Sequence, residues 1–147
     1  MRRAVRWVDA ESVRHYQVIV YAAFACAGVQ AISLGAPPPT IAAAMGEAVA
    51  VAWVAMLIGG PALTLSGLWL DRRRRPIGLW MQIAGDAQVT AAAAAYATAV
   101  TQATWADRAT FAAWLSAAIA VCALAMVVRD IRRVVTAVRM VRQMEAE

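Results

Sequence analysis

Four consecutive arginines, Arg72–Arg75, interrupt an apolar sequence and constrain the chain on either side. The uncharged run from Ala48 to Leu70 precedes them, and a second, mostly apolar run from Ile77 to Val100 follows. About 20 helical residues cross a hydrocarbon core of about 30 Å, so each run is long enough to span a bilayer. Four guanidinium groups cannot cheaply cross that core, and we therefore expect this loop to stay cytoplasmic.

The overall composition favours a membrane protein over a soluble one. Of 147 residues, 63% are hydrophobic and the mean hydropathy is +0.60, whereas soluble domains are about 45–50% apolar. A soluble fold of this length has too little interior for so much apolar surface. The sequence therefore predicts an all-α, polytopic membrane protein with four transmembrane helices and a C-terminal amphipathic basic helix.

Charges and prolines predict the boundaries of these segments. Residues 1–15 form a basic N-terminal segment, which we expect to be retained as an interfacial helix. The spans are predicted at about residues 16–34, 48–70, 77–100 and 109–128. The proline-rich loop Gly35–Thr40 should be extended, with Thr40 capping a short helix over residues 41–45. Residues 129–147 form the cytoplasmic tail, whose valines and arginines recur on opposite helical faces.

The distribution of arginine predicts the orientation. With four spans, 13 of the 14 basic residues lie on one side, and Arg108 is the exception. Short loops rich in arginine stay cytoplasmic, so both termini are expected inside, in the cytoplasmic (inner) membrane. The positive charge is explained by anionic lipid headgroups, and we expect no nucleic-acid partner. The expected topology and headgroup anchors are Arg72, Arg73, Arg74, Arg75, Arg129, Arg132 and Arg133.

The second predicted span carries Gly59, Gly60 and Pro61 near its middle. A proline inside a helix removes one backbone hydrogen bond and kinks it, and glycines let a neighbouring helix approach. A kink that improves packing is the favoured interpretation, and a gating hinge is the alternative.

Asp86 is the only acidic residue inside the predicted spans. Gln82, Asp86 and Thr90 follow one another at intervals of four residues and therefore share one helical face. Counting from Ile77 places Asp86 about 13 Å into the span, near the membrane midplane. A carboxylate there is expensive to ionise and usually faces a partner or a wet cavity. We consider three interpretations of Asp86: structural hydrogen bonding between helices, proton or cation passage, and lining of a homo-oligomeric pore. Its expected hydrogen-bond partners are Gln82, Thr90, Gln30 or the backbone groups freed by Pro61.

The sequence contains no recognisable catalytic constellation. His15 is the only histidine, and Cys26 and Cys122 lie in separate apolar runs, where small buried side chains are expected. We therefore predict no enzyme activity, no catalytic residue, no metal site and no cofactor.

The segment PIGLWMQIAGDAQVTAAAAAYATAV (residues 76–100), the turn Gly59–Pro61 and the loop APPPT resemble small four-span membrane proteins of actinobacterial phages. The resemblance implies the four-span architecture and a phage host, and, since some members of that group are treated as holin-like, it hints at an oligomeric, pore-forming function. In that case the small-residue faces of the third and fourth spans would bring copies together. The alternatives are an accessory protein for host envelope modification or superinfection exclusion, and a small ion or proton channel using Asp86.

Overall fold

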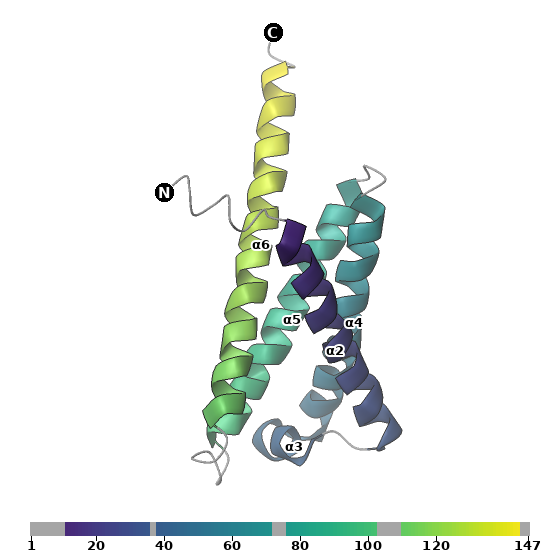
Figure 1. The fold of residues 1–147 in the computed structure, drawn as a ribbon, viewed down its shortest axis with the longest axis vertical. Coiled ribbons are helices and arrows are strands. Elements are labelled where there is room, and N and C mark those ends of the chain that lie inside the picture. Colours follow the sequence, from purple (N-terminus) through teal and green to yellow (C-terminus); the bar gives the residue numbers. More distant parts are fainter. Residues whose placement is uncertain (1–10, 36–37, 72–75, 103–109, 145–147) are drawn as a thin grey trace.

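The computed structural model describes residues 11–35, 38–71, 76–102 and 110–144, and these residues contain helices and no strand (Figure 1). The helices, in chain order, are α2 (Glu11–Ser33), α3 (Pro39–Met45), α4 (Glu47–Asp71), α5 (Pro76–Gln102) and α6 (Thr110–Met144). The all-α prediction is therefore confirmed for this part of the chain. The arginine cluster 72–75, the N-terminal segment to residue 10 and Arg108 lie outside the described residues.

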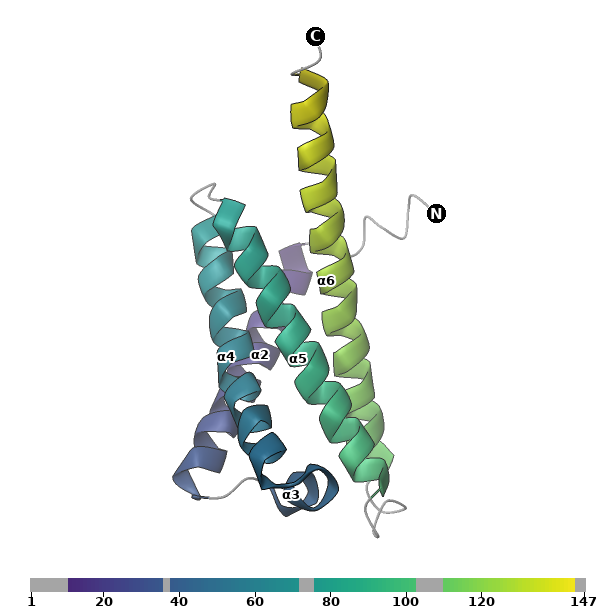
Figure 2. The same ribbon diagram turned by 180° about the vertical axis from the view of Figure 1, so that it is seen from behind.

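The four long helices form an up-and-down bundle in which α5 is central. Helix α5 packs against both α4 and α6, while α2 packs against α4. Figures 1 and 2 show the first turn of α2, the end of α4, the start of α5 and the C-terminal half of α6 towards one end of the bundle. We call this the basic end, because it carries the arginines of α6. The short helix α3 lies at the opposite end, against α4 and α5.

Two pairs of glycines allow α4 and α5 to pack closely. A Cβ added to Gly60 would lie 3.1 Å from the carbonyl oxygen of Gly85, and one added to Gly67 would lie 2.6 Å from that of Gly78. The glycines are seven residues apart on both helices, so they meet in register across an antiparallel pair. The predicted close approach at the glycines before Pro61 is thus confirmed at Gly60.

An apolar core fills the half of the bundle near α3. Its members lie on α3, α4 and α5, and Trp53 is the largest of them. The Trp53 indole N–H donates to the carbonyl oxygen of Ala92 over 2.8 Å, and its ring stacks on Tyr96 with centroids 6.0 Å apart. This pairing satisfies the indole and ties α4 to α5, because a buried donor without a partner is costly.

Three helices are long and apolar enough to cross a membrane, namely α2 over Tyr16–Ser33, α4 over Glu47–Leu70 and α6 over Thr110–Thr136. Helix α5 has 27 residues but is not among them. Its polar side chains explain the difference, and two of them, Gln82 and Asp86, are at most 1% exposed. By hydropathy alone the described helices thus provide three spans, one fewer than predicted.

Several helix limits differ from the sequence prediction. Helix α3 begins at Pro39 after Pro38, so Thr40 lies inside it and makes no side-chain cap. Helix α4, by contrast, continues through Pro61 and agrees with the predicted second span to within one residue at each end. The predicted fourth span and basic tail form one continuous helix, α6, because Arg129 ends the apolar run without interrupting the backbone hydrogen bonding.

Candidate functional site

Asp86 lies on the central helix α5 and is fully buried. Its neighbour Gly85 is the reason that α4 comes near, since a Cβ at Gly85 would collide with the Thr64 hydroxyl oxygen and stand 2.5 Å from the Gly60 carbonyl oxygen. The missing side chain leaves room for Thr64 to reach the carboxylate. Because Gly85 and Asp86 are neighbours in the sequence, the close contact between α4 and α5 lies next to the buried carboxylate.

Three side chains from two other helices donate hydrogen bonds to Asp86. The Tyr21 hydroxyl donates to Oδ1 over 2.8 Å, and the Thr64 hydroxyl donates to the same atom over 3.0 Å. The Gln17 amide nitrogen lies 3.2 Å from Oδ1 and 3.5 Å from Oδ2. We call these four residues the Asp86 cluster. Donors that converge on a carboxylate reduce the cost of burying it.

The predicted partners of Asp86 do not contact its carboxylate. The Gln82 amide donates to the Gly78 carbonyl oxygen over 3.3 Å, and the Thr90 hydroxyl donates to the backbone carbonyl of Asp86 over 2.8 Å. Gln30 is exposed and lies near the other end of α2. Residues on one helical stripe point in similar directions, so a buried side chain finds its partners on facing helices.

The sequence patterns do not single out Gln17 and Tyr21. Both lie in the first turns of the predicted first span, four residues apart and therefore on one face of α2. That spacing of two polar side chains at the start of an apolar run was the available signal. Thr64 was visible as a polar residue after Pro61, but its partner could not be identified without the α4–α5 register.

The Asp86 cluster lies nearer the basic end of the bundle than the opposite end. Asp86 is the eleventh of the 27 residues of α5, which begins at this end. The uncharged part of α6 from Thr110 to Val128 extends about 28 Å, and Arg129 follows it towards the basic end. Gln17 likewise lies within the first two turns of α2. The position of Asp86 relative to the membrane midplane stays a prediction.

A second buried carboxylate, Asp130, forms an ion pair at this level. Arg129 Nε donates to Asp130 Oδ1 over 2.8 Å, and Arg133 Nη1 lies 3.6 Å from the same oxygen. The side chain of Asp130 is fully buried and that of Arg129 is 11% exposed. The structure therefore places Arg129, an expected headgroup anchor, mainly in an ion pair, whereas Arg132 is exposed as expected.

An apolar cluster separates Asp86 from the opposite end of the bundle. Tyr21, Val89 and Ala123 form it, and Val20 and Phe24 pack against it. We call this group the apolar plug. Val89 lies one turn beyond Asp86 on α5, about 4.5 Å along the helix axis. Farther on, a cavity of about 730 Å³ opens between the four long helices, with Leu57, Ala92 and Ala93 in its wall.

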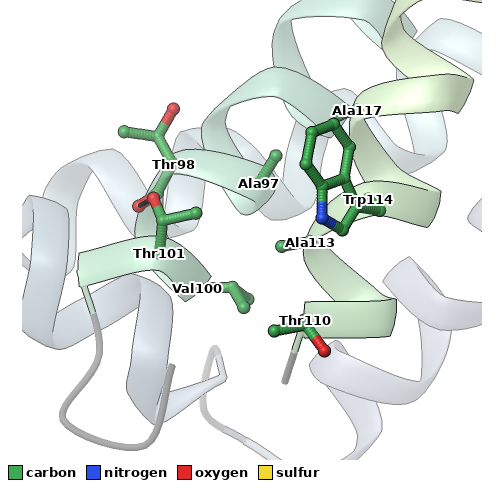
Figure 3. Close-up of a pocket in the computed structure, with 8 residues that line it drawn as sticks. All are labelled: Ala97, Thr98, Val100, Thr101, Thr110, Ala113, Trp114 and Ala117. Atoms are coloured by element: carbon green, nitrogen blue, oxygen red, sulfur yellow. Dashed lines mark hydrogen bonds between the residues drawn. The ribbon is translucent and has the colours of Figure 1, made fainter. Parts of the chain in front are cut away.

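Another recess lies between the end of α5 and the start of α6 (Figure 3). It has a volume of about 440 Å³, and Trp114 and Thr110 form its α6 side. The Thr98 and Thr101 hydroxyls on the α5 side donate to backbone carbonyls of their own helix. Among the described residues, those that line this recess carry no titratable side chain.

The described residues contain no group of three or more side chains suited to hold a metal ion. Cys26 and Cys122 are free and exposed, so the expectation that they are buried is wrong. No protein-family model, curated protein or solved structure matches the chain.

Proposed function

We propose that this chain is a four-span protein of the cytoplasmic membrane that conducts protons by binding and releasing them at Asp86. The observation that carries the proposal is a fully buried carboxylate held by three uncharged donors, namely two hydroxyls and an amide. Ionisable groups placed so within membrane helices are typical of proton relays and ion pathways.

Helix α5 is the fourth span in this proposal. It lies between α4 and α6 in both views of the bundle, antiparallel to each, and is long enough to cross a bilayer (Figures 1 and 2). Its polar residues Gln82 and Asp86 are buried against other helices and do not face lipid. Helix α5 can therefore cross the membrane with a lower mean hydropathy than a helix surrounded by lipid. An even number of spans also keeps both termini on the same side as the basic end, which we assign to the cytoplasm.

The polar groups supply one half of a proton path. From the basic end, the Arg129–Asp130 pair leads to Asp86, where the Tyr21 and Thr64 hydroxyls can each reorient to donate or accept. On the far side, the apolar plug keeps Asp86 from the large cavity. Hydrophobic constrictions of this kind gate by excluding water. The chain in this conformation would therefore exchange protons with the basic end and be closed towards the other.

The holin-like and accessory functions stay predictions, as do the phage origin and the homo-oligomer. A pore lined by the α5 stripe would require the bundle to open, since Gln82 and Asp86 are buried within one chain. Asp86 could also be a structural hydrogen-bond acceptor between helices and nothing more. The effect of substituting Asp86 on proton flux distinguishes this interpretation from proton conduction.

Proton flux into proteoliposomes, followed with an enclosed pH-sensitive dye under an imposed potential, tests the proposal. Asp86→Asn keeps the size and most hydrogen bonds of the side chain but cannot carry the proton, so flux should fall to the level of empty vesicles while the helical content and thermal unfolding persist. Glu47→Gln, at the exposed start of α4, is the matched control and should conduct normally. Equal flux in Asp86→Asn and the unaltered chain contradicts proton conduction through this residue.

The four-span topology has its own test. Single cysteines placed at Arg73 and Arg139, in a chain whose Cys26 and Cys122 are replaced by alanine, should resist an impermeant thiol reagent in intact cells and react after lysis. A cysteine at Thr101, near the other end of α5, should react from outside. Labelling of Arg73→Cys and Thr101→Cys from the same side contradicts a membrane-crossing α5.

A further inference from the structure

Among the described residues, one buried side-chain atom lacks a hydrogen-bond partner, namely the amide oxygen Oε1 of Gln17. The residue is 7% exposed, and its amide nitrogen is directed at the Asp86 carboxylate. A buried acceptor without a donor is destabilising, so its presence beside a proton-binding group needs a reason. We propose that Gln17 is a positioning residue whose amide turns over when Asp86 takes up a proton, so that Oε1 accepts the hydrogen bond of the new carboxyl O–H.

The two oxygens of Asp86 receive different numbers of donors. Oδ1 lies 2.8 Å from the Tyr21 hydroxyl and 3.0 Å from the Thr64 hydroxyl. The Gln17 nitrogen is 3.2 Å from Oδ1, and within the described part of the chain it is the only donor to Oδ2, at 3.5 Å. A proton on Oδ1 would displace two short hydrogen bonds, whereas a proton on Oδ2 displaces one contact at the limit of hydrogen bonding. The added proton therefore belongs on Oδ2.

A proton on Oδ2 needs an acceptor, and Gln17 can supply one. A protonated carboxyl group is a donor, but the group that faces Oδ2 is an NH₂ group, which cannot accept. Rotation of the terminal amide by about 180° exchanges its nitrogen and its oxygen. Oε1 then faces the Oδ2 proton, and Asp86 and Gln17 share a hydrogen bond of reversed direction. The new O–H bond is the only covalent bond that forms, and none breaks.

The surroundings of Gln17 allow its amide to turn. Gln17 borders a recess of about 250 Å³ between α2 and α6, together with Val20 and Met126. The terminal torsion of a glutamine side chain is broad and roughly two-fold, so both orientations are accessible to it. Turning pairs Oε1 and releases the nitrogen from Asp86. The two orientations therefore make similar numbers of hydrogen bonds, as a site that both binds and releases a proton requires.

The other titratable groups near Asp86 do not offer this acceptor. Tyr21 of α2 already donates its hydroxyl hydrogen to Oδ1. On α6, Arg129 Nε donates to Asp130 Oδ1 over 2.8 Å, so these two charges are paired with each other. Helix α4 is uncharged between its first and last residues. In the described part of the bundle, Gln17 is thus the side chain placed to respond to the charge on Asp86.

This inference rests on the proton binding proposed for Asp86, but it does not require the proton to cross the membrane. The orientation of the Gln17 amide depends only on whether Oδ2 carries a proton.

Infrared difference spectroscopy of the reconstituted full chain, produced with glutamine isotopically labelled at its side-chain carbonyl carbon, tests the inference. On acidification the C=O band of one labelled amide should move to lower frequency, because that oxygen gains a hydrogen bond. The shift should accompany the protonated carboxyl band of Asp86, and both should be lost in Asp86→Asn.

Variants of two glutamines on α2 assign the shifted band. Gln17→Leu should lose the shift, whereas Gln30→Leu, at an exposed position on the same helix, should keep it. Gln17→Glu preserves the size of the side chain and should also lose the shift, which gives a second assignment. An Asp86 carboxyl band without a shifted amide band, or a shift that persists in either Gln17 variant, overturns the inference. A chain that shows both bands but conducts no protons supports this role of Gln17 and contradicts the proposed conduction.

Discussion

The Tyr21 hydroxyl donates to Asp86 Oδ1 over 2.8 Å and so connects the start of the first long helix to the middle of the bundle. Tyr21 is 3% exposed and Asp86 is fully buried. The same tyrosine belongs to the apolar plug through its ring. It therefore has two roles, since its polar end satisfies the carboxylate and its apolar body separates that carboxylate from the cavity.

Removal of this hydroxyl should destabilise the bundle. Tyr21→Phe leaves the ring in place but deprives a buried carboxylate of one donor, which we expect to cost about 1–3 kcal/mol. Thermal or denaturant unfolding in detergent, followed by circular dichroism, measures the loss. Tyr16→Phe is the control, because Tyr16 is 72% exposed. Similar stabilities of the two variants would show that the Tyr21–Asp86 bond contributes nothing.

Thr64 should be coupled energetically to Tyr21, because both hydroxyls donate to the same oxygen of Asp86. Thr64→Val keeps the shape of the side chain and should cost about 1–2 kcal/mol. The double variant Tyr21→Phe/Thr64→Val should deviate from the sum of the single losses by more than about 0.5 kcal/mol. The control is Thr98→Val, whose hydroxyl is exposed and bonded to its own helix. Strict additivity would argue against a shared site.

The close glycine contact between α4 and α5 predicts that Gly85→Ala and Gly59→Ala differ in their effect on stability. Gly85→Ala would drive a methyl group into the Thr64 hydroxyl and towards the Gly60 carbonyl, and should cost about 1–3 kcal/mol as the helices separate. Gly59→Ala meets only the end of the Gln88 side chain, at 3.2 Å, and gains helix propensity. Unfolding measurements should find Gly59→Ala near neutral. A stable Gly85→Ala variant would contradict the close α4–α5 packing.

The Arg129–Asp130 ion pair should contribute more to the stability of the fold than the exposed Arg132 does. Asp130→Ala leaves Arg129 largely buried without its closest counter-charge, and we expect a loss of about 1–3 kcal/mol. Arg132→Gln should have no measurable effect on unfolding, because Arg132 is exposed. Equal stability of Asp130→Ala and the unaltered chain would show that Arg129 escapes to the lipid headgroups.

Sequence patterns predicted the helical architecture well because it depends on local properties. Long uncharged runs and the break at Arg72–Arg75 predicted helices close to α2, α4, α5 and α6. The predicted fourth span and basic tail lie on one continuous helix, since charge changes the environment of a helix without ending it. Helix α5 shows the limit of hydropathy, because burial against α4 and α6 lets polar residues remain in a long helix.

The candidate site could be predicted only in part. Asp86 stood out as a lone acidic residue, but its partners depend on the register of three helices separated in sequence. Thr64 reaches it because Gly85 has no side chain, and Gln17 and Tyr21 reach it because α2 begins beside α6. No periodicity within one segment encodes these relationships.

The central claim is that Asp86 takes up and releases a proton in the folded protein. Infrared difference spectroscopy of the reconstituted chain between acidic and neutral pH measures this directly through the carboxyl C=O band. We predict a band of protonated carboxyl that grows reversibly on acidification and is missing in Asp86→Asn but retained in Glu47→Gln. An identical set of bands in Asp86→Asn would contradict this claim.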